Sequence, residues 1–274
     1  MSAAGPLLTR EVQELLAAAH GQGSATVECS LDLGRTRSTV RIGADRWHWR
    51  SGDYPYPDDC RERTVYHWDG TAFRAVSRYG EGLVKLVPTA WGPPTFEIDG
   101  IKMLPTAHVS PWEDARGKVA LVEPRGKAIL DCCGGLGYFA AACLESGAAR
   151  VRSCERSPDV LWLRGLNPWS PGPDPRLTLE SADVTAAVRD LADASVDAVL
   201  HDPPRFGIAG ELYSRDFYAQ LARVLRRGGR MFHYTGAPNR VSRGRDLAGE
   251  VARRLRDAGF HAEPRGDGVL AVRR

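Results

Sequence analysis

Hydrophobic and polar positions follow different patterns in the two halves of the chain. In the first half, short stretches alternate apolar and polar side chains, which is typical of half-buried antiparallel strands. These stretches lie at residues 26–33, 38–42, 46–49, 64–68, 73–76, 83–87 and 95–98. The turn Asp69-Gly70 predicts a hairpin, and a helical period over residues 7–19 precedes the first strand. We therefore predict a small antiparallel β-rich domain with one short helix over residues 1–108.

In the second half, short strand-like runs alternate with helical patterns. The runs occupy residues 127–131, 151–155, 177–183, 196–201 and 230–234. The run 196–201 is mostly apolar, which is typical of a buried parallel strand. Ser214 is placed to cap a helix that ends at Gly228-Gly229, and residues 262–263 and 269–272 are expected to close the sheet as a hairpin. The pattern predicts an α/β, Rossmann-like, seven-stranded domain over residues 109–274.

A glycine-rich turn follows the first of these runs. Asp131 is followed by Cys132-Cys133-Gly134-Gly135-Leu136-Gly137, after which residues 138–144 begin a helix. Glycines let the backbone approach a ligand closely, and a helix N-terminus offers unpaired N–H groups. Glu155 ends the next run, where its carboxylate can accept both hydroxyls of a ribose. Nicotinamide and S-adenosylmethionine sites share this arrangement, and a purely structural turn is the alternative.

Two more strand ends carry acids. Asp183 ends the third run, where it is a candidate acceptor for an adenine amine. The fourth run ends in Asp202-Pro203-Pro204-Arg205-Phe206. Prolines cannot continue a strand ladder, so the backbone leaves the sheet at the edge where open α/β sheets bind ligands. There Asp202 and the Pro203 carbonyl can accept the two hydrogens of an amino group and aim its lone pair, unless Asp202 only caps the turn.

The four strand ends, in this order, resemble the class I S-adenosylmethionine-dependent methyltransferases over about residues 112–274. Cys133 stands where the family pattern has its first glycine, a replacement often seen in RNA methyltransferases. The string 201–206, with Pro111-Trp112-Glu113-Asp114 and Asn167-Pro168-Trp169-Ser170, resembles a mostly archaeal family of predicted RNA methyltransferases over about residues 93–260. The resemblance implies S-adenosyl-L-methionine as cofactor. It also implies methylation of an exocyclic base nitrogen, first N4 of a ribosomal RNA cytidine and second N2 of guanosine.

The resemblance and the spacing together assign site residues. Expected at the cofactor are Trp112, Asp131, Cys133, Gly134, Gly135, Gly137, Glu155, Asn167, Asp183 and Val184. Expected in catalysis are Asp202, Pro203, Pro204 and Phe206. Expected at the substrate are Arg205, Tyr234, Arg240, Arg243 and Arg245. Amino-methyltransferases usually place an aromatic residue directly after Pro-Pro, whereas Arg205 precedes Phe206 here, so either side chain is a candidate to cover the base.

Charge is uneven along the chain. The net charge is +3, yet residues 215–274 contain 14 Arg, no Lys and six acids. Arginines suit phosphate contacts, which favours RNA as partner, ribosomal before transfer RNA. The alternative is a solvated surface in a chain that uses Arg in place of Lys generally. Tryptophans gathered in the first half are likewise candidates either for base stacking or for the core.

Composition narrows the remaining possibilities. The six cysteines contain no C-x-x-C pair and lie mostly in predicted buried strands, which argues against a metal site and a disulfide framework. No apolar stretch reaches the roughly 20 residues that span a bilayer, and no secretory signal is evident, so a cytoplasmic enzyme is expected. An aminopropyltransferase of polyamine synthesis, or a related methyltransferase of a small-molecule amine, is the second possibility, although an aminopropyltransferase needs additional carboxylates around a cationic amine. A non-catalytic RNA-binding module is the third, disfavoured by the intact acids. The sequence does not indicate the oligomeric state.

Overall fold

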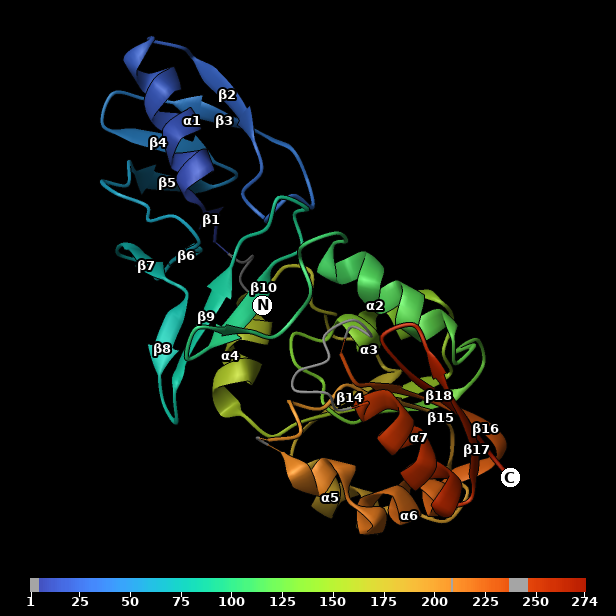
Figure 1. Ribbon diagram of the computed structural model, residues 1–274. Coiled ribbons are helices and arrows are strands. Elements are labelled where there is room, and N and C mark those ends of the chain that lie inside the picture. The colour runs from blue at the N-terminus through green and yellow to red at the C-terminus, as the bar shows by residue number, and fades with distance from the viewer. Residues whose placement is uncertain (1–4, 208, 237–245) are drawn as a thin grey trace. The chain divides into compact units, whose positions relative to one another are not determined.

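The computed structural model describes residues 5–207, 209–236 and 246–274, and the chain divides into two compact units (Figure 1). The first unit comprises the chain up to Trp112 together with Trp162–Trp169. The second comprises Glu113–Leu161 and Ser170–Arg274. The segment Trp162–Trp169 therefore belongs to the first unit, although these residues lie outside the range 1–108 that was expected for the N-terminal domain.

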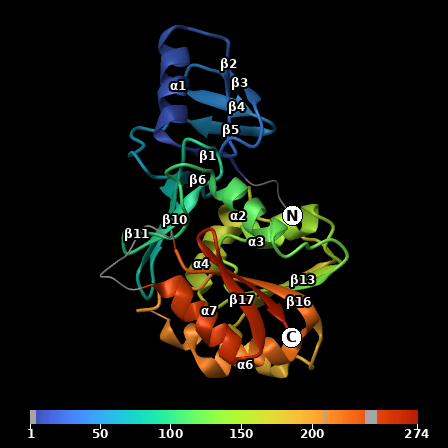
Figure 2. The same cartoon turned by 45° about the vertical axis from the view of Figure 1, so that its right-hand side comes forward.

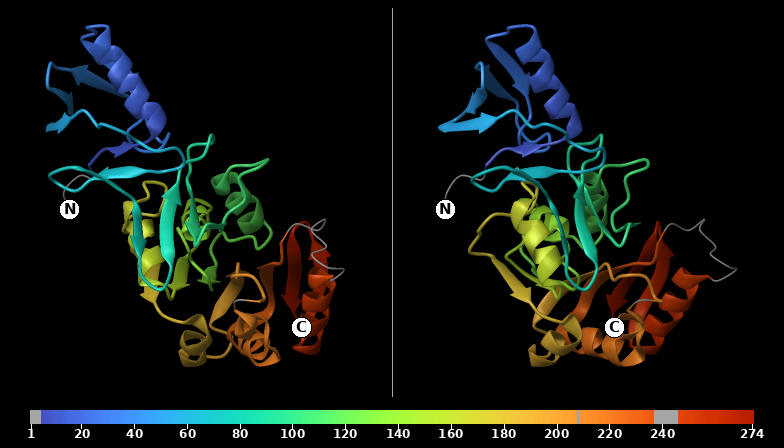
Figure 3. Two further views of the ribbon diagram at one scale, coloured as in Figure 1. Left: turned by 60° about the vertical axis from the view of Figure 1, so that its left-hand side comes forward. Right: turned by 90° about the vertical axis from the view of Figure 1, so that its left-hand side faces the viewer.

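In the described residues up to Lys102, the first unit contains the helix α1 and three small antiparallel sheets, and its segment Trp162–Trp169 adds the end of a second helix. Its sheets have the strand orders β1-β6-β7, β2-β3-β4-β5 and β11-β10-β9-β8. Figure 2 shows α1 alongside the sheet of β2 to β5, and Figure 3 shows β8 and β9 as a cyan ribbon. The elements in chain order are β1 (Leu7–Leu8), α1 (Arg10–Gly21), β2 (Thr26–Cys29), β3 (Ser38–Ile42), β4 (Arg46–Trp49), β5 (Gly52–Pro55), β6 (Tyr66–Trp68), β7 (Phe73–Ala75), β8 (Ser77–Tyr79), β9 (Leu83–Val87), β10 (Thr95–Ile98) and β11 (Ile101–Lys102).

Helix α1 begins later than the apolar period predicted. Leu7 and Leu8 form β1, which pairs with β6, and Thr9 caps the helix by accepting a hydrogen bond from the Val12 N–H. The helix buries Val12, Leu16 and Ala19, whereas Leu15, expected on the same face, is 41% exposed. Leu15 directly precedes Leu16, and neighbouring helix positions lie about 100° apart, so the two side chains point to different faces.

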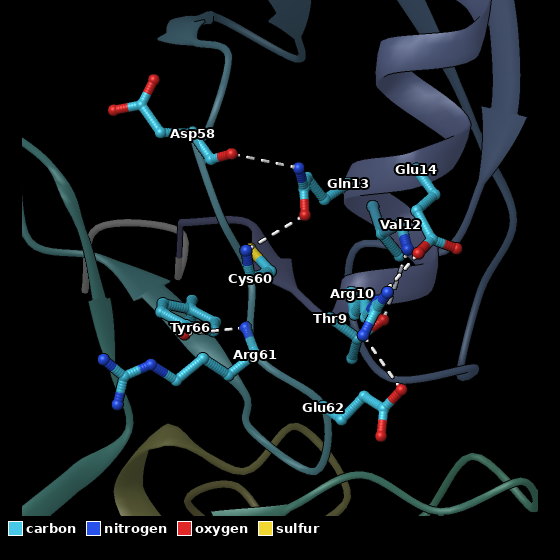
Figure 4. A network of polar contacts seen from close by, with 10 residues as sticks. All are labelled: Thr9, Arg10, Val12, Gln13, Glu14, Asp58, Cys60, Arg61, Glu62 and Tyr66. Atoms are coloured by element: carbon cyan, nitrogen blue, oxygen red, sulfur yellow. Dashed lines mark hydrogen bonds and ion pairs between the residues drawn. The ribbon is translucent and has the colours of Figure 1, made fainter.

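Polar contacts fix the start of α1 to the segment around Cys60 (Figure 4). The Gln13 side chain accepts from the Cys60 N–H at 3.0 Å and donates to the Asp58 carbonyl at 3.4 Å. Arg10 donates to Glu14, one turn further along α1, and to Glu62, which belongs to the segment around Cys60. The irregular chain between β5 and β6 is thus tied to a regular element.

Aromatic side chains fill the core of the first unit. Trp47 is fully buried and stacks on Tyr54, with ring centroids 4.7 Å apart, and Trp68 and Phe73 pack around them. For Trp47 the core assignment is therefore confirmed and base stacking is excluded. Trp91 differs, because 49% of it is exposed.

The second unit contains a seven-stranded sheet with the order β14-β13-β12-β15-β16-β18-β17. The strands β14, β13, β12, β15 and β16 are parallel to one another. Strand β18 is antiparallel to both of its neighbours, as the predicted C-terminal hairpin requires. The elements in chain order are α2 (Pro111–Ala120), β12 (Ala128–Asp131), α3 (Tyr138–Glu145), β13 (Arg150–Glu155), α4 (Pro158–Leu166), β14 (Leu177–Ser181), α5 (Val184–Ala187), η1 (Val188–Asp190), β15 (Val196–His201), η2 (Gly210–Tyr213), α6 (Arg215–Val224), β16 (Leu225–Tyr234), α7 (Leu247–Asp257), β17 (Phe260–Arg265) and β18 (Gly268–Arg273). Helices α2 and α4 each cross the boundary between the units.

Helices cover both faces of this sheet, with α3 on one face and α6 and α7 on the other (Figure 1). Ser214 caps α6 as predicted, accepting from the Phe217 N–H at 3.1 Å. The helix ends at Val224, earlier than the predicted stop at Gly228-Gly229, and both glycines lie inside β16. Leu225, expected on the helix, is the first residue of that strand, and a register shift between β15 and β16 accommodates the glycines.

Among the described residues, no helix combines the length and the apolar character needed to cross a membrane.

The neighbouring residues Leu15 and Leu16 give a matched test of the first unit. Leu16→Ala should lower the free energy of unfolding of this unit by about 2–5 kcal/mol, because a fully buried leucine leaves a cavity. Leu15→Ala should change it by about 0.5 kcal/mol or less. All seven tryptophans lie in the first unit, so urea unfolding followed by tryptophan fluorescence reports on it selectively. Equal effects of the two substitutions would contradict the orientation of α1.

Candidate functional site

The candidate site lies at the carboxyl edge of the seven-stranded sheet. Strand β12 has β13 on one side and β15 on the other, so the chain's crossover connections leave it in opposite directions. Ligands of open α/β sheets bind at such a switch point, outside the carboxyl ends of the strands. Asp131 ends β12 there, is fully buried, and accepts a hydrogen bond from Ser153 Oγ at 2.7 Å.

The glycine-rich turn after Asp131 is held by both neighbouring strands. The Cys132 N–H donates to the Leu200 carbonyl of β15 at 2.9 Å, and the Gly134 N–H donates to the Cys154 carbonyl of β13 at 2.8 Å. Gly135 and Gly137 have φ angles of 49° and 84°, a region that favours glycine. The turn is thereby fixed over the strand ends and leads directly into α3.

Glu155 is positioned by the turn that it faces. Its Oε2 accepts from the Gly135 N–H at 2.9 Å and its Oε1 accepts from the Ser157 N–H at 2.9 Å. Each carboxylate oxygen has two acceptor lone pairs, so these bonds orient the side chain without exhausting it. The carboxylate is therefore rigidly aimed at the mouth of the glycine turn.

Asp183 lies just beyond the strand on which it was expected. Strand β14 ends at Ser181, and Asp183 caps the short helix α5, which begins at Val184. Its Oδ1 accepts from both the N–H and the hydroxyl of Thr185, at 2.8 and 2.7 Å. The cap leaves Oδ2 outside this pair of bonds, so Asp183 stays a candidate acceptor at the same sheet edge.

The chain leaves β15 through the Asp202-Pro203-Pro204 corner. The Tyr213 hydroxyl, from η2, donates to the Pro204 carbonyl at 3.1 Å. Phe206 is half-buried against the Tyr213 ring, with the Arg254 guanidinium 5.6 Å from its ring centroid. Arg205 is exposed. Of the two candidates to cover a base, Phe206 is therefore engaged by protein side chains, whereas Arg205 faces solvent.

His201 lies beneath this corner in the core. It is fully buried, its Nε2 is 3.1 Å from the Leu212 carbonyl oxygen, and its ring meets that of His233 edge-on at 4.4 Å. Burial lowers the pKa of His201 to about 4, so the imidazole is neutral at physiological pH. His201 is therefore a neutral core residue.

The Asp202 carboxyl lies in an unusual electrostatic environment. Burial raises its pKa to about 7; Lys118 opposes this rise, while Asp114, Asp267 and Asp131 add to it. Lys118 itself is 5% exposed and contacts Asp114 at 2.7 Å and Asp267 at 3.3 Å. Sequence reasoning did not assign Lys118 or Asp267 to the site, and it noted Asp114 only as part of the string 111–114. The i, i+4 spacing of Asp114 and Lys118 was the available signal, but a surface pair has the same spacing.

The remaining residues that the sequence assigned to the site lie in other parts of the chain. Trp112 and Asn167 belong to the first unit, where the Trp112 ring lies 6.2 Å from that of Trp169 and the Asn167 Oδ1 accepts from the Trp169 N–H. Tyr234 ends β16. The cluster Arg240, Arg243 and Arg245 lies outside the described residues.

Several other C-terminal arginines are engaged in ion pairs. Arg223 contacts Asp193, Arg226 contacts Asp197 and Arg254 contacts Glu250. These three arginines are paired with acids of the same unit, which is neither the phosphate contact nor the solvated surface that the sequence left open. Within residues 5–207, 209–236 and 246–274, no group of three or more His, Cys, Asp or Glu side chains is arranged to hold a metal ion.

The strand order and the glycine turn define a methyltransferase-like Rossmann fold, and solved structures share it. Spermidine synthase in complex with the transition-state analogue AdoDATO superposes with a TM-score of 0.57 at 19% identity, covering 71% of each chain. Spermidine synthase from Thermotoga maritima gives 0.55 at 20% identity over 71% of this chain and 70% of that one. MnmC2 from Aquifex aeolicus gives 0.50 at 19% identity over 71% of each. At these identities the likeness establishes the fold.

Sequence comparison identifies the family. The chain is 42% identical over 261 residues to the uncharacterized protein MJ1233 of Methanocaldococcus jannaschii, covering 91% of this chain and 89% of that protein. No protein-family model matches the chain. The chain belongs to the same family as this archaeal protein.

The thiol of Cys133 offers a test of the electrostatics of the site. Burial, reinforced by Cys132, Glu155 and Asp202, raises the pKa of Cys133 well above its usual value. Because the thiolate is the reactive form, alkylation of Cys133 by iodoacetamide at pH 8 should be at least about tenfold slower in the folded protein than in urea. Peptide mass spectrometry measures both rates. Equal rates would contradict the acidic surroundings.

Proposed function

We propose that this protein is an S-adenosylmethionine-dependent methyltransferase that acts on an exocyclic amino nitrogen of an RNA base. The observation that carries the proposal is the convergence of the glycine turn, Glu155 and the Asp202-Pro203-Pro204 corner at one sheet edge. One part of this edge suits a nucleoside and the other suits an amino group.

The residues at the switch point fit the cofactor. Gly135 and Gly137 keep the turn free of side chains where a ligand must approach, and Glu155 presents a carboxylate already aligned by two backbone N–H groups. Glu155 would hold the ribose hydroxyls, and Asp183 would accept from the adenine amine. S-adenosylmethionine supplies an electrophilic methyl group, so the protein has to align the acceptor and manage its proton.

The Asp202 corner suits that task. The amino group of a base is delocalised into its ring and is a poor nucleophile. Acceptance of its two hydrogens by Asp202 and the Pro203 carbonyl would direct the nitrogen lone pair away from the ring. The bond from Tyr213 to the Pro204 carbonyl holds the corner rigid. A carboxyl with a pKa of about 7 is also suited to take up the released proton near neutral pH.

The RNA substrate is supported by chemistry outside the described site. Residues 215–274 carry 14 Arg against six acids, and Arg205 is exposed next to the proposed acceptor position. A resemblance of residues 201–206 to an archaeal RNA methyltransferase family favours N4 of a ribosomal cytidine, with N2 of guanosine second.

One observation favours a second function, aminopropyl transfer to a polyamine. Asp114 and Asp267 supply the additional carboxylates near Asp202 that a cationic amine requires. Lys118 occupies the position between these carboxylates, which weakens the case because it already compensates part of their charge. Incubation with labelled S-adenosylmethionine and total RNA, or with decarboxylated cofactor and putrescine, separates the two functions. Labelled RNA supports the first proposal, and labelled polyamine overturns it.

Glu155 tests the cofactor assignment. Glu155→Gln keeps one acceptor oxygen for the turn but removes the charge, so the affinity for S-adenosylmethionine should fall at least about tenfold. Isothermal titration calorimetry measures it. The exposed Glu145→Gln, in the same unit, should bind as the wild type does. A folded Glu155→Gln variant with unchanged affinity would reject the assignment.

Asp202 tests the chemistry. Asp202→Ala should leave cofactor affinity within about threefold but slow methyl transfer by roughly a hundredfold or more, and Asp202→Asn should fall between the two. Single-turnover transfer to RNA measures the step. The exposed Asp190→Asn serves as the matched control. Near-normal turnover of Asp202→Ala would reduce the Asp-Pro-Pro corner to a structural role.

A further inference from the structure

Three strand ends place charged and aromatic side chains next to the Asp202 corner. In the sheet register, His201 of β15 lies opposite His233 of β16, so Asp202 follows at the level of Tyr234. Tyr234 in turn lies opposite Gly268 of β18, which Asp267 directly precedes. Asp202, Tyr234 and Asp267 therefore form a row across the sheet edge.

Lys118 of α2 joins this row from the helix. Its ammonium is 2.7 Å from Asp114 Oδ2, 3.3 Å from Asp267 Oδ2 and 4.0 Å from the centroid of the Tyr234 ring. The first contact lies within the helix, the second reaches the turn between β17 and β18, and the third covers the end of β16. One cation thus connects three elements around the Asp202 corner.

The position is costly for an isolated ammonium. Lys118 is 5% exposed, and burial alone would lower its pKa, yet Asp202, Asp114 and Asp267 together raise it above the usual value. Removing one partner of a buried ion pair leaves an uncompensated charge, so the lysine and the carboxylates depend on one another. Of the four lysines in the chain, Lys118 is the one in this position.

The turn that carries Asp267 is itself fixed. The Thr235 N–H and hydroxyl both donate to the Asp267 carbonyl, at 3.0 and 3.3 Å. The Asp267 carboxylate is therefore held against Lys118 by backbone contacts that do not involve charge. The hydrogen bonds from Thr235 thus fix the position of Asp267 independently of its ion pair with Lys118.

We propose that Lys118 is a positioning residue for the reaction, whose ammonium, held by Asp114 and Asp267 over the Tyr234 ring, keeps Asp202 in the carboxylate form that accepts the substrate amine. The inference rests on the proposed function of Asp202. A protonated Asp202 would keep acceptor capacity but would lose its charge, would present a hydroxyl donor to an amino group that is also a donor, and could not receive its proton.

The charges around Asp202 determine whether each neighbouring group raises or lowers its pKa. The groups that act on Asp202 or respond to it come from every element that meets at the corner: Lys118 and Asp114 of α2, Asp131 and Cys133 at the end of β12, Tyr213 of η2, Tyr234 of β16 and Asp267. Among them Lys118 is the cation, and the acids act against it. Loss of Lys118 should raise the pKa of Asp202, and loss of Asp267 should lower it.

Two substitutions with opposite expected signs test the proposal. Carbon-13 NMR of aspartate-labelled protein, with the Asp202 signal assigned from Asp202→Asn, measures the pKa without any substrate. Lys118→Met should raise the pKa of Asp202 by about one unit or more, whereas Lys118→Arg, which keeps the positive charge, should leave this pKa near its wild-type value. Asp267→Asn, which keeps the buried lysine paired with Asp114, should lower it. The exposed Lys102→Met is the matched control and should leave it unchanged.

The pH dependence of methyl transfer provides the second readout. Transfer that needs the carboxylate rises with pH through the pKa of Asp202, so its acid limb should move to higher pH in Lys118→Met and to lower pH in Asp267→Asn. An Asp202 pKa that is the same in wild type, Lys118→Met and Asp267→Asn would overturn the inference. If Lys118→Met does not fold, Asp267→Asn decides alone: a lower pKa supports the inference and an unchanged pKa overturns it. A shifted pKa combined with full activity of Asp202→Ala would instead refute the proposed function.

Discussion

The hydrogen bonds between the glycine turn and the two strands beside it are the constraint on which the candidate site depends. Cys132 is bound to Leu200 of β15, and Gly134 is bound to Cys154 of β13, so the turn cannot move independently of either strand. Glu155 ends one of these strands and Asp202 follows the other, so the two bonds hold the turn between the two acids, whose separation is set by the pairing of both strands with β12. Sites built on strand ends gain precision in this way, since the sheet ladder holds what loops alone would leave loose.

Burial of charge is the second theme of the second unit. Asp114, Asp131, Asp202 and Asp267 influence one another in a region with a single nearby ammonium. Replacing a buried ion cluster by apolar side chains is often neutral or stabilising, so such a cluster is weak evidence for stability and better evidence for function. The neutral pair of His201 and His233 below the corner shows the contrast. There the fold buries titratable groups in their uncharged form.

The parallel strands could be predicted because each is a short strand-like stretch bounded by a glycine, proline or acid. The stretches of β12 and β15 are mostly apolar, whereas β13 and β14 also contain polar side chains. The Asp-Pro-Pro corner and the cap at Ser214 were likewise local signals. The errors fall where local signals compete with tertiary contacts. Leu7 lies within the helical pattern predicted over residues 7–19, but pairing with β6 makes it a strand residue. Gly228 and Gly229 look like a helix stop, although they lie within β16. The Lys118 cluster could not be predicted, because it joins positions almost 150 residues apart through the sheet register.

The discontinuous first unit has a consequence for how the chain can be made and divided. The Trp162 ring lies under the Arg78 guanidinium at 4.9 Å, and the Trp169 indole donates to the Leu33 carbonyl at 2.9 Å. These contacts belong to a unit whose other residues end at Trp112. On the ribosome, domains usually fold from the N-terminus as they emerge. Here the N-terminal unit stays incomplete until Glu113–Leu161, about a third of the second unit, has been synthesised, and no single cut in the chain separates the two units intact.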